Sequence, residues 1–160
     1  MNNIIDVATG EVKVGGKNEI LVSNALGSCI AVVAIDTEQK VGGIAHVMLA
    51  GKSPANEKQK TKYAFNAINE LFKKLQEIDS GEGNLKVFIA GGGNVLKLKD
   101  DTVCEANIKS TIEFLAIKGI NIHKKAVGGT ERRTVRLDIS NRTVYCSEGN
   151  SSEEILWKEN

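Results

Sequence analysis

Hydrophobic and polar positions follow two rhythms along this 160-residue chain, and together they predict a mixture of strands and helices. Short apolar runs and alternation with a period of two are typical of strands. We therefore expect strands over residues 11–14, 19–23, 29–35, 41–49, 85–90, 120–127, 133–139 and 143–147. Residues 148–160 form a polar tail in which three apolar side chains stand together: Ile155, Leu156 and Trp157.

Two segments have the three-to-four-residue apolar spacing of an amphipathic helix. The first covers residues 57–77, and the second runs from about residue 107 to Gly119. Asn107 has the side chain of an N-cap, and glycine is the usual residue just beyond a helix C-terminus. The apolar stripes consist of Ala64, Ile68, Leu71 and Leu75 in the first helix and of Ile108, Ile112 and Leu115 in the second.

Strands lie before, between and after the two helices, and this order predicts mixed sheets and the α+β class. Hydrophobic residues make up 41% of the chain but aromatic residues only 4%, so Ile, Val, Leu and Ala must build the core. We expect one domain over residues 1–147, followed by the polar tail over residues 148–160.

A formal net charge of +1 argues against a strongly basic nucleic-acid-binding protein. The N-terminus lacks a basic segment followed by an apolar one, and no apolar run approaches the roughly 20 residues of a membrane span. We therefore expect a cytoplasmic protein that does not insert into membranes. One basic cluster is either a solvated face or a docking surface for an acidic helical partner: Lys124, Lys125, Arg132, Arg133 and Arg136.

Cys29 and His46 flank the polar turn at residues 36–40, and they are candidates for a nucleophile and its base. If Ile35 pairs with Lys40, Cys29 lies directly opposite His46 on the same face of the hairpin. An imidazole there is expected to lower the pKa of the thiol. The alternative is structural, because a cysteine in an apolar strand is usually a small buried hydrophobe and His46 would then be a core histidine.

The residues before Cys29 supply candidates for the rest of such a site. Ser23 or Asn24 could offer an oxygen acceptor that holds the imidazole. Gly27 permits a tight turn, and backbone N–H groups near Ser28 and Cys29 could face a developing oxyanion.

Other chemistry is poorly supported. The cysteines and histidines (Cys29, His46, Cys104, His123 and Cys146) have none of the close pairing of structural zinc ligands, so we expect no metal. His123 is expected to be structural or at the surface, and Cys104 and Cys146 to be inert. The glycines at 91–93 match neither phosphate-binding pattern, and a tight turn or a close backbone approach at the site rim is expected instead.

Residues 23–29 (SNALGSC) and 42–49 (GGIAHVML), with seventeen residues between cysteine and histidine, resemble the CheD family of chemoreceptor glutamine deamidases. Further likeness lies in residues 85–92, in Asn107, which matches the asparagine that opens the family's second helix, and in the block around Arg133. The chain departs from the family at Ser23, where threonine is usual, and at Cys104, where glycine is usual. Residues 130–132 (TER) also differ from the usual small or polar run.

The resemblance implies a layered α+β sandwich of mixed sheets with helices packed outside. It also implies a cysteine hydrolase that converts glutamine side chains of methyl-accepting chemotaxis receptors to glutamate, with Cys29, His46 and Ser23 as the catalytic group and no cofactor. Many relatives bind the phosphatase CheC. A non-catalytic regulatory module acting through CheC or receptors is the alternative, and serine at position 23 leaves room for it.

Overall fold

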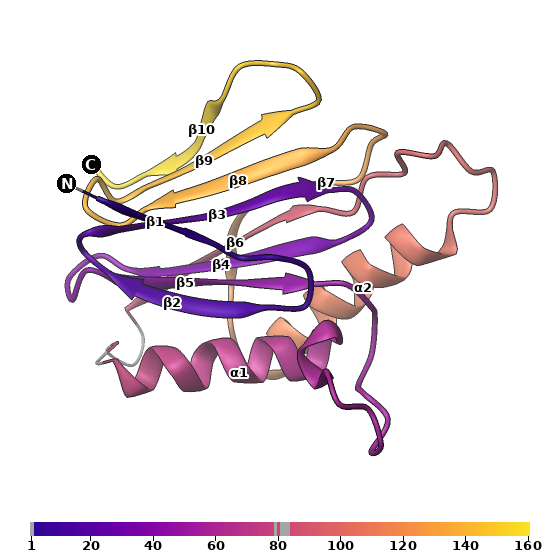
Figure 1. The fold of residues 1–160 in the computed structure, drawn as a ribbon, viewed down its shortest axis with the longest axis horizontal. Helices are drawn as coiled ribbons and strands as arrows, with labels where there is room; N and C mark the ends of the chain where they lie inside the picture. Colours follow the sequence, from indigo (N-terminus) through magenta and orange to yellow (C-terminus); the bar gives the residue numbers. More distant parts are fainter. Residues whose placement is uncertain (1, 79, 81–83) are drawn as a thin grey trace.

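The computed structural model describes residues 2–78, 80 and 84–160, which form three layers: two stacked sheets and a layer of helices (Figure 1). The outer sheet has the order β1-β3-β8-β9-β10, with bounds Asn3–Asp6, Glu19–Leu26, Arg133–Asp138, Thr143–Glu148 and Glu154–Lys158. The inner sheet has the order β2-β5-β4-β6-β7, with bounds Val12–Gly16, Val41–Val47, Ile30–Asp36, Leu85–Gly91 and Ile122–Val127. Both sheets mix parallel and antiparallel pairs, which confirms the expected α+β sandwich.

The central strand β4 explains why the chain needs so apolar a segment, since all seven of its residues are buried. Alternate residues of β4 face two different cores, because successive side chains of a strand point to opposite faces. Ala31, Val33 and Ile35 pack between the sheets, while Ile30 and Val32 pack against the helices. The inner sheet is therefore covered on both faces.

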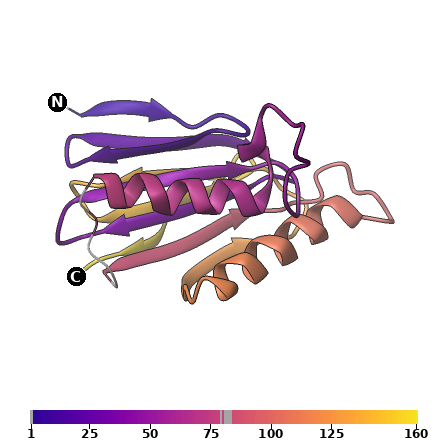
Figure 2. The same cartoon turned by 90° about the horizontal axis from the view of Figure 1, so that it is seen from below.

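Helices α1 (Ala64–Glu77) and α2 (Thr102–Ile117) both cover the face of the inner sheet that is turned away from the outer sheet (Figure 2). The predicted stripe of the first helix is correct, because Ala64, Ile68, Leu71 and Leu75 are all buried. The predicted start at residue 57 is wrong. A 3₁₀ turn at Lys60–Lys62 and an extended Tyr63 precede α1.

The second helix also begins earlier than its pattern indicates. Asp101 is its N-cap and accepts a hydrogen bond from the Cys104 backbone N–H at 3.1 Å. Asn107 is therefore not the cap but a buried residue inside α2, on a face that the apolar spacing alone does not identify.

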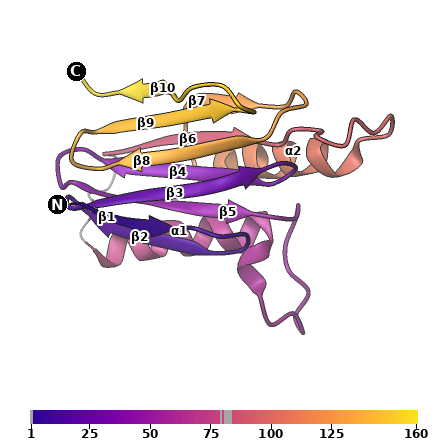
Figure 3. The same cartoon turned by 45° about the horizontal axis from the view of Figure 1, so that its top comes forward.

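Both ends of the chain add strands to the outer sheet (Figure 3). The sequence pattern gave no indication of β1, which runs parallel to β3. The polar tail contains β10, which pairs with β9, and Trp157 stacks on Phe88 of the inner sheet with ring centroids 5.0 Å apart. The tail thus contributes to the core between the sheets.

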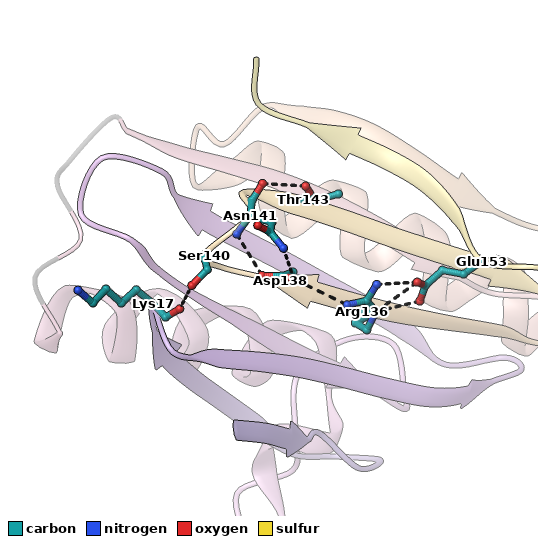
Figure 4. A network of polar contacts seen from close by, with 7 residues as sticks. All are labelled: Lys17, Arg136, Asp138, Ser140, Asn141, Thr143 and Glu153. Atoms are coloured by element: carbon teal, nitrogen blue, oxygen red, sulfur yellow. Dashed lines mark hydrogen bonds and ion pairs between the residues drawn. The ribbon is translucent and has the colours of Figure 1, made fainter. Parts of the chain in front are cut away.

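The predicted basic cluster does not exist as one surface, because β7 and β8 belong to different sheets. Arg133 is only 6% exposed and binds Glu148. Arg136 forms ion pairs with Glu153 and Asp138 and stacks on Tyr145 (Figure 4). Only the lysines of β7 remain as an exposed basic pair. The cluster therefore offers no docking surface for an acidic partner.

Candidate active site

The hairpin formed by β4 and β5 brings the candidate nucleophile and base to one face, in a register different from the predicted one. His46 lies opposite Ala31, and Asp36 pairs with Val41, so the predicted pairing of Ile35 with Lys40 is wrong. Cys29 is consequently two residues beyond the partner of His46, on the same face and diagonal to it. Diagonal neighbours have Cα atoms about 7–8 Å apart, against about 5 Å for direct partners.

The turn between the strands accounts for this shift. The Asp36 carboxylate accepts hydrogen bonds from the N–H groups of Glu38 and Gln39, both at 3.0 Å. Lys40 has a φ of 54°, in the left-handed region, and so belongs to the loop and not to β5. Each strand is displaced by one residue, and the total shift of two preserves the face on which each side chain lies.

His46 is held by a backbone carbonyl that the sequence did not point to. Its Nδ1 lies 3.0 Å from the Val7 oxygen, and the ring is only 2% exposed. A carbonyl only accepts, so the proton must sit on Nδ1 and the neutral ring keeps a lone pair on Nε2. Nε2 is buried and has no hydrogen-bond partner among the described residues. The site therefore contains an oriented imidazole with a free basic nitrogen.

Ser23 converges on the same carbonyl, because its Oγ donates to the Val7 oxygen at 2.9 Å. Ser23 is fully buried on the inner face of β3, across the interior from the hairpin. Neither Ser23 nor Asn24 supplies the acceptor for the imidazole, as the sequence led us to expect. Asn24 is exposed, and its amide faces Asp6 at 3.4 Å. Ser23 and His46 are thus linked through Val7, which follows β1.

Cys29 is partly exposed at the end of β4 and packs against the core between the sheets. Burial raises the pKa of its thiol, and burial also lowers the pKa of His46, partly opposed by Val7, Asp6 and Glu11. The expected lowering of the thiol pKa is therefore wrong for the resting protein. No hydrogen bond joins the Cys29 sulfur to His46 in the described part of the chain. The pair rests as a neutral thiol and a neutral imidazole.

The glycines after β6 form the rim beside Cys29, as expected. A Cβ at Gly91, whose φ is 121°, would lie 2.1 Å from the Cys29 carbonyl oxygen. The Gly92 N–H donates to that same oxygen at 2.9 Å, and the Gly93 N–H donates to the Gly27 oxygen at 2.8 Å. The glycines are therefore required for a close backbone approach that fixes the turn around Cys29.

Two further features shape the turn before Cys29. Ala25 has a φ of 55° at an irregularity in the pairing of β3 with β8, and such bulges often re-aim the chain near active sites. Ser28 is tied to the helix layer, because the Asn107 Nδ2 donates to its carbonyl at 2.8 Å. Val7 and Asn107 are the two residues that the sequence analysis missed. Backbone carbonyls have no residue-type pattern, and Asn107 was assigned as a cap.

The structure offers little support for other kinds of site. Across residues 2–78, 80 and 84–160, no three histidine, cysteine or acidic side chains come together as metal ligands. His123 is exposed, as predicted. Within the same residues, neither helix has the length and apolar character needed to cross a membrane.

Comparison with known proteins gives consistent matches over most of the chain. The CheD family model, described as CheD chemotactic sensory transduction, matches residues 48–148. A probable chemoreceptor glutamine deamidase CheD from Chlorobium luteolum is 39% identical over 150 residues, covering 93% of this chain and 75% of that protein. A protein of the same name from Methanococcus maripaludis is 30% identical over 154 residues, covering 95% and 99%. The chemoreceptor glutamine deamidase CheD of Thermotoga maritima is 29% identical over 153 residues, covering 96% and 97%.

Proposed function

The chain belongs to the CheD family, and from this premise we propose that it deamidates glutamine side chains of chemotaxis receptors. The observation that carries the proposal is the state of His46. Its Nδ1 is occupied by Val7, and its buried Nε2 is free on the face of the hairpin that also carries Cys29. A general base must have an available lone pair close to the proton that it removes.

The proposed reaction passes through a thioester on Cys29. The sulfur attacks the carboxamide carbon while His46 Nε2 takes the thiol proton, and the carbonyl oxygen becomes an oxyanion. Collapse breaks the C–N bond, and the proton on His46 leaves with ammonia. Water then attacks the thioester with His46 again as base, which releases glutamate and restores the thiol. The net change is one amide plus one water to one carboxylic acid plus ammonia, and no cofactor enters.

The remaining candidates act through the backbone in this proposal. Cys29 N–H is the donor for the oxyanion, and Ser28 and Gly27 hold the turn that presents it. Ser23 fixes the Val7 carbonyl and through it the imidazole. Asn24, exposed near the mouth of the site, would contact substrate and not the ring.

CheC is a second proposed partner, and the family resemblance alone supports it. Titration of purified CheC against the chain, followed by calorimetry, tests this part separately. Binding without any deamidation would favour the alternative of a non-catalytic regulatory module.

The decisive experiment incubates the chain with a receptor cytoplasmic fragment and follows the mass shift from glutamine to glutamate. Wild type should deamidate particular glutamines, and Cys29→Ala should not. Cys146→Ala is the matched control, because Cys146 is a buried thiol of β9 that lies outside the proposed site. Equal deamidation by wild type and Cys29→Ala, or none by wild type on a fragment known to be deamidated, would overturn the proposal.

A further inference from the structure

Asn107 joins the two strand ends that carry the candidate nucleophile and base. It lies within α2 and is 1% exposed. Its Nδ2 donates to the Ser28 carbonyl at 2.8 Å and to the Met48 carbonyl at 3.0 Å. Ser28 immediately precedes Cys29, and Met48 follows His46 by two residues. One amide group of the helix layer therefore fixes both ends of the hairpin.

The bond to Ser28 also determines where the next N–H points. In a trans peptide the carbonyl of one residue and the N–H of the next lie on opposite sides of the chain. With the Ser28 oxygen held toward α2, the Cys29 N–H must point away from the helix layer. Since the helices cover the other face of the inner sheet, that direction is the side on which the Cys29 and His46 side chains lie.

The Cys29 N–H is a free donor. It has no hydrogen-bond partner among the described residues, although the Cys29 carbonyl is held by Gly92 at 2.9 Å. Both peptide planes that flank Cys29 are therefore fixed by partners outside the turn. A fixed, unpartnered N–H beside the attacking sulfur has the geometry needed to bind a developing oxyanion.

The cost of keeping Asn107 points to a role for its two N–H groups. Its Oδ1 is buried and has no hydrogen-bond partner among the described residues. An unpaired buried acceptor costs about 1–3 kcal/mol, which an apolar side chain at this position would avoid. Only a neutral amide of this size offers two donors from one nitrogen.

We propose that Asn107 is a positioning residue that locks the Ser28–Cys29 peptide with its N–H toward the reacting carbon, so that the oxyanion hole is preformed. It acts through this peptide and does not touch the substrate. The inference rests on the proposed deamidation for its catalytic consequence, but the orientation of the peptide can be measured without any receptor.

The first test compares Asn107→Asp and Asn107→Leu with wild type in two reactions. Asn107→Asp keeps the size of the side chain but removes both donors at neutral pH. We expect kcat for deamidation to fall by about 10²–10³, the usual cost of losing an oxyanion donor, with KM nearly unchanged. Alkylation of Cys29 by iodoacetamide proceeds by displacement of iodide and forms no oxyanion, so its rate should stay within about threefold.

Asn69→Asp is the matched control, because it makes the same change at an α1 side chain that accepts from Lys118 at the surface. It should leave both reactions unchanged. If kcat in the Asn107 variants stays near wild type, or if alkylation falls in parallel with kcat, the positioning role is wrong.

The second test uses the fact that residues 28 and 29 form the single Ser-Cys sequence of the chain. Carbonyl-¹³C serine with ¹⁵N cysteine therefore gives one carbonyl–amide correlation in the NMR spectrum, from this peptide alone. The peak should shift or broaden in Asn107→Asp and stay unchanged in Asn69→Asp, while the Trp157 indole signal reports that the fold persists. An unchanged peak would overturn the inference. Inactive wild type with the expected peak change would instead refute the proposed function.

Discussion

The turn that carries Cys29 and the first turn of α2 that carries Cys104 are neighbours, yet they hold their thiols in different ways. Both contact the glycine rim, since Gly93 donates to the Gly27 oxygen and accepts from the Cys104 sulfur at 3.3 Å. Burial, with the carboxylate of Asp101, raises the pKa of Cys104 to about 11. Burial also raises the pKa of Cys29, but its sulfur is partly exposed.

The comparison teaches that a low resting pKa is not what sets Cys29 apart. Both thiols are protonated at neutral pH. Cys104 is 5% exposed and already donates its proton to a carbonyl, which cannot act as a base at neutral pH. Cys29 shares its face of the hairpin with an imidazole whose Nε2 is free. Access and an available proton acceptor distinguish the two regions.

Removing the acceptor should break the distinction with the largest effect. His46→Asn keeps an N–H donor near the position of Nδ1, and so the contact with Val7, but deletes the basic Nε2. Deamidation kcat should fall by about 10²–10⁴, the usual contribution of a general base. Urea unfolding should confirm that the variant is folded. Retention of full activity would show that the base lies elsewhere.

The pH profile distinguishes a neutral pair from a resting ion pair. Burial lowers the pKa of His46 below 6.5, so the imidazole stays neutral and basic throughout the neutral range. We expect kcat/KM to be flat there and to fall about tenfold per unit only below that lowered pKa, as His46 takes up a proton. A thiolate absorbance at neutral pH that disappears in Cys29→Ser would contradict this picture.

Ser23 offers a smaller and more graded test. Ser23→Ala removes the hydroxyl that donates to Val7, and one neutral hydrogen bond is worth about 0.5–1.5 kcal/mol. We expect kcat/KM to fall by about two- to tenfold, while Ser23→Thr keeps the donor and most of the activity. A loss in Ser23→Ala as large as that in His46→Asn would mean that the hydroxyl takes part in the chemistry.

The smallest effect on deamidation is expected at Cys104. Cys104→Ala removes a buried thiol and its bond to Gly93, so the free energy of unfolding should fall by about 1 kcal/mol. Urea denaturation measures this change, and kcat/KM should stay within about twofold of wild type. A loss of activity like that of Cys29→Ala would remove the contrast between the two thiols.

The sequence predicted the shared face of Cys29 and His46 but not their separation. Side-chain faces repeat every two residues, so an error of two in the register left the faces correct. The loop that caused the error depends on the left-handed Lys40, a conformation with no pattern of its own. The apolar stripe of α1 was equally readable, because it records burial directly.

The parts that could not be predicted are those that depend on backbone atoms and on the stacking of sheets. Val7 holds Ser23 and His46 with its carbonyl, and every residue type has one. Arg133 and Lys125 are close in sequence but lie in different sheets. Asn107 has the residue type of a helix cap, and only the structure shows that its amide points into the site.

The span of these hydrogen bonds along the chain sets the time at which the site can exist. Ser23 and His46 meet Val7 across 16 and 39 residues, and Asn107 meets Ser28 across 79. A chain still growing on the ribosome contains the β4–β5 hairpin, with its cysteine and histidine, long before α2 emerges to hold it. Contacts between such distant residues close late in folding. Receptor modification therefore becomes possible only when the fold is almost complete, which keeps an unfinished chain chemically silent.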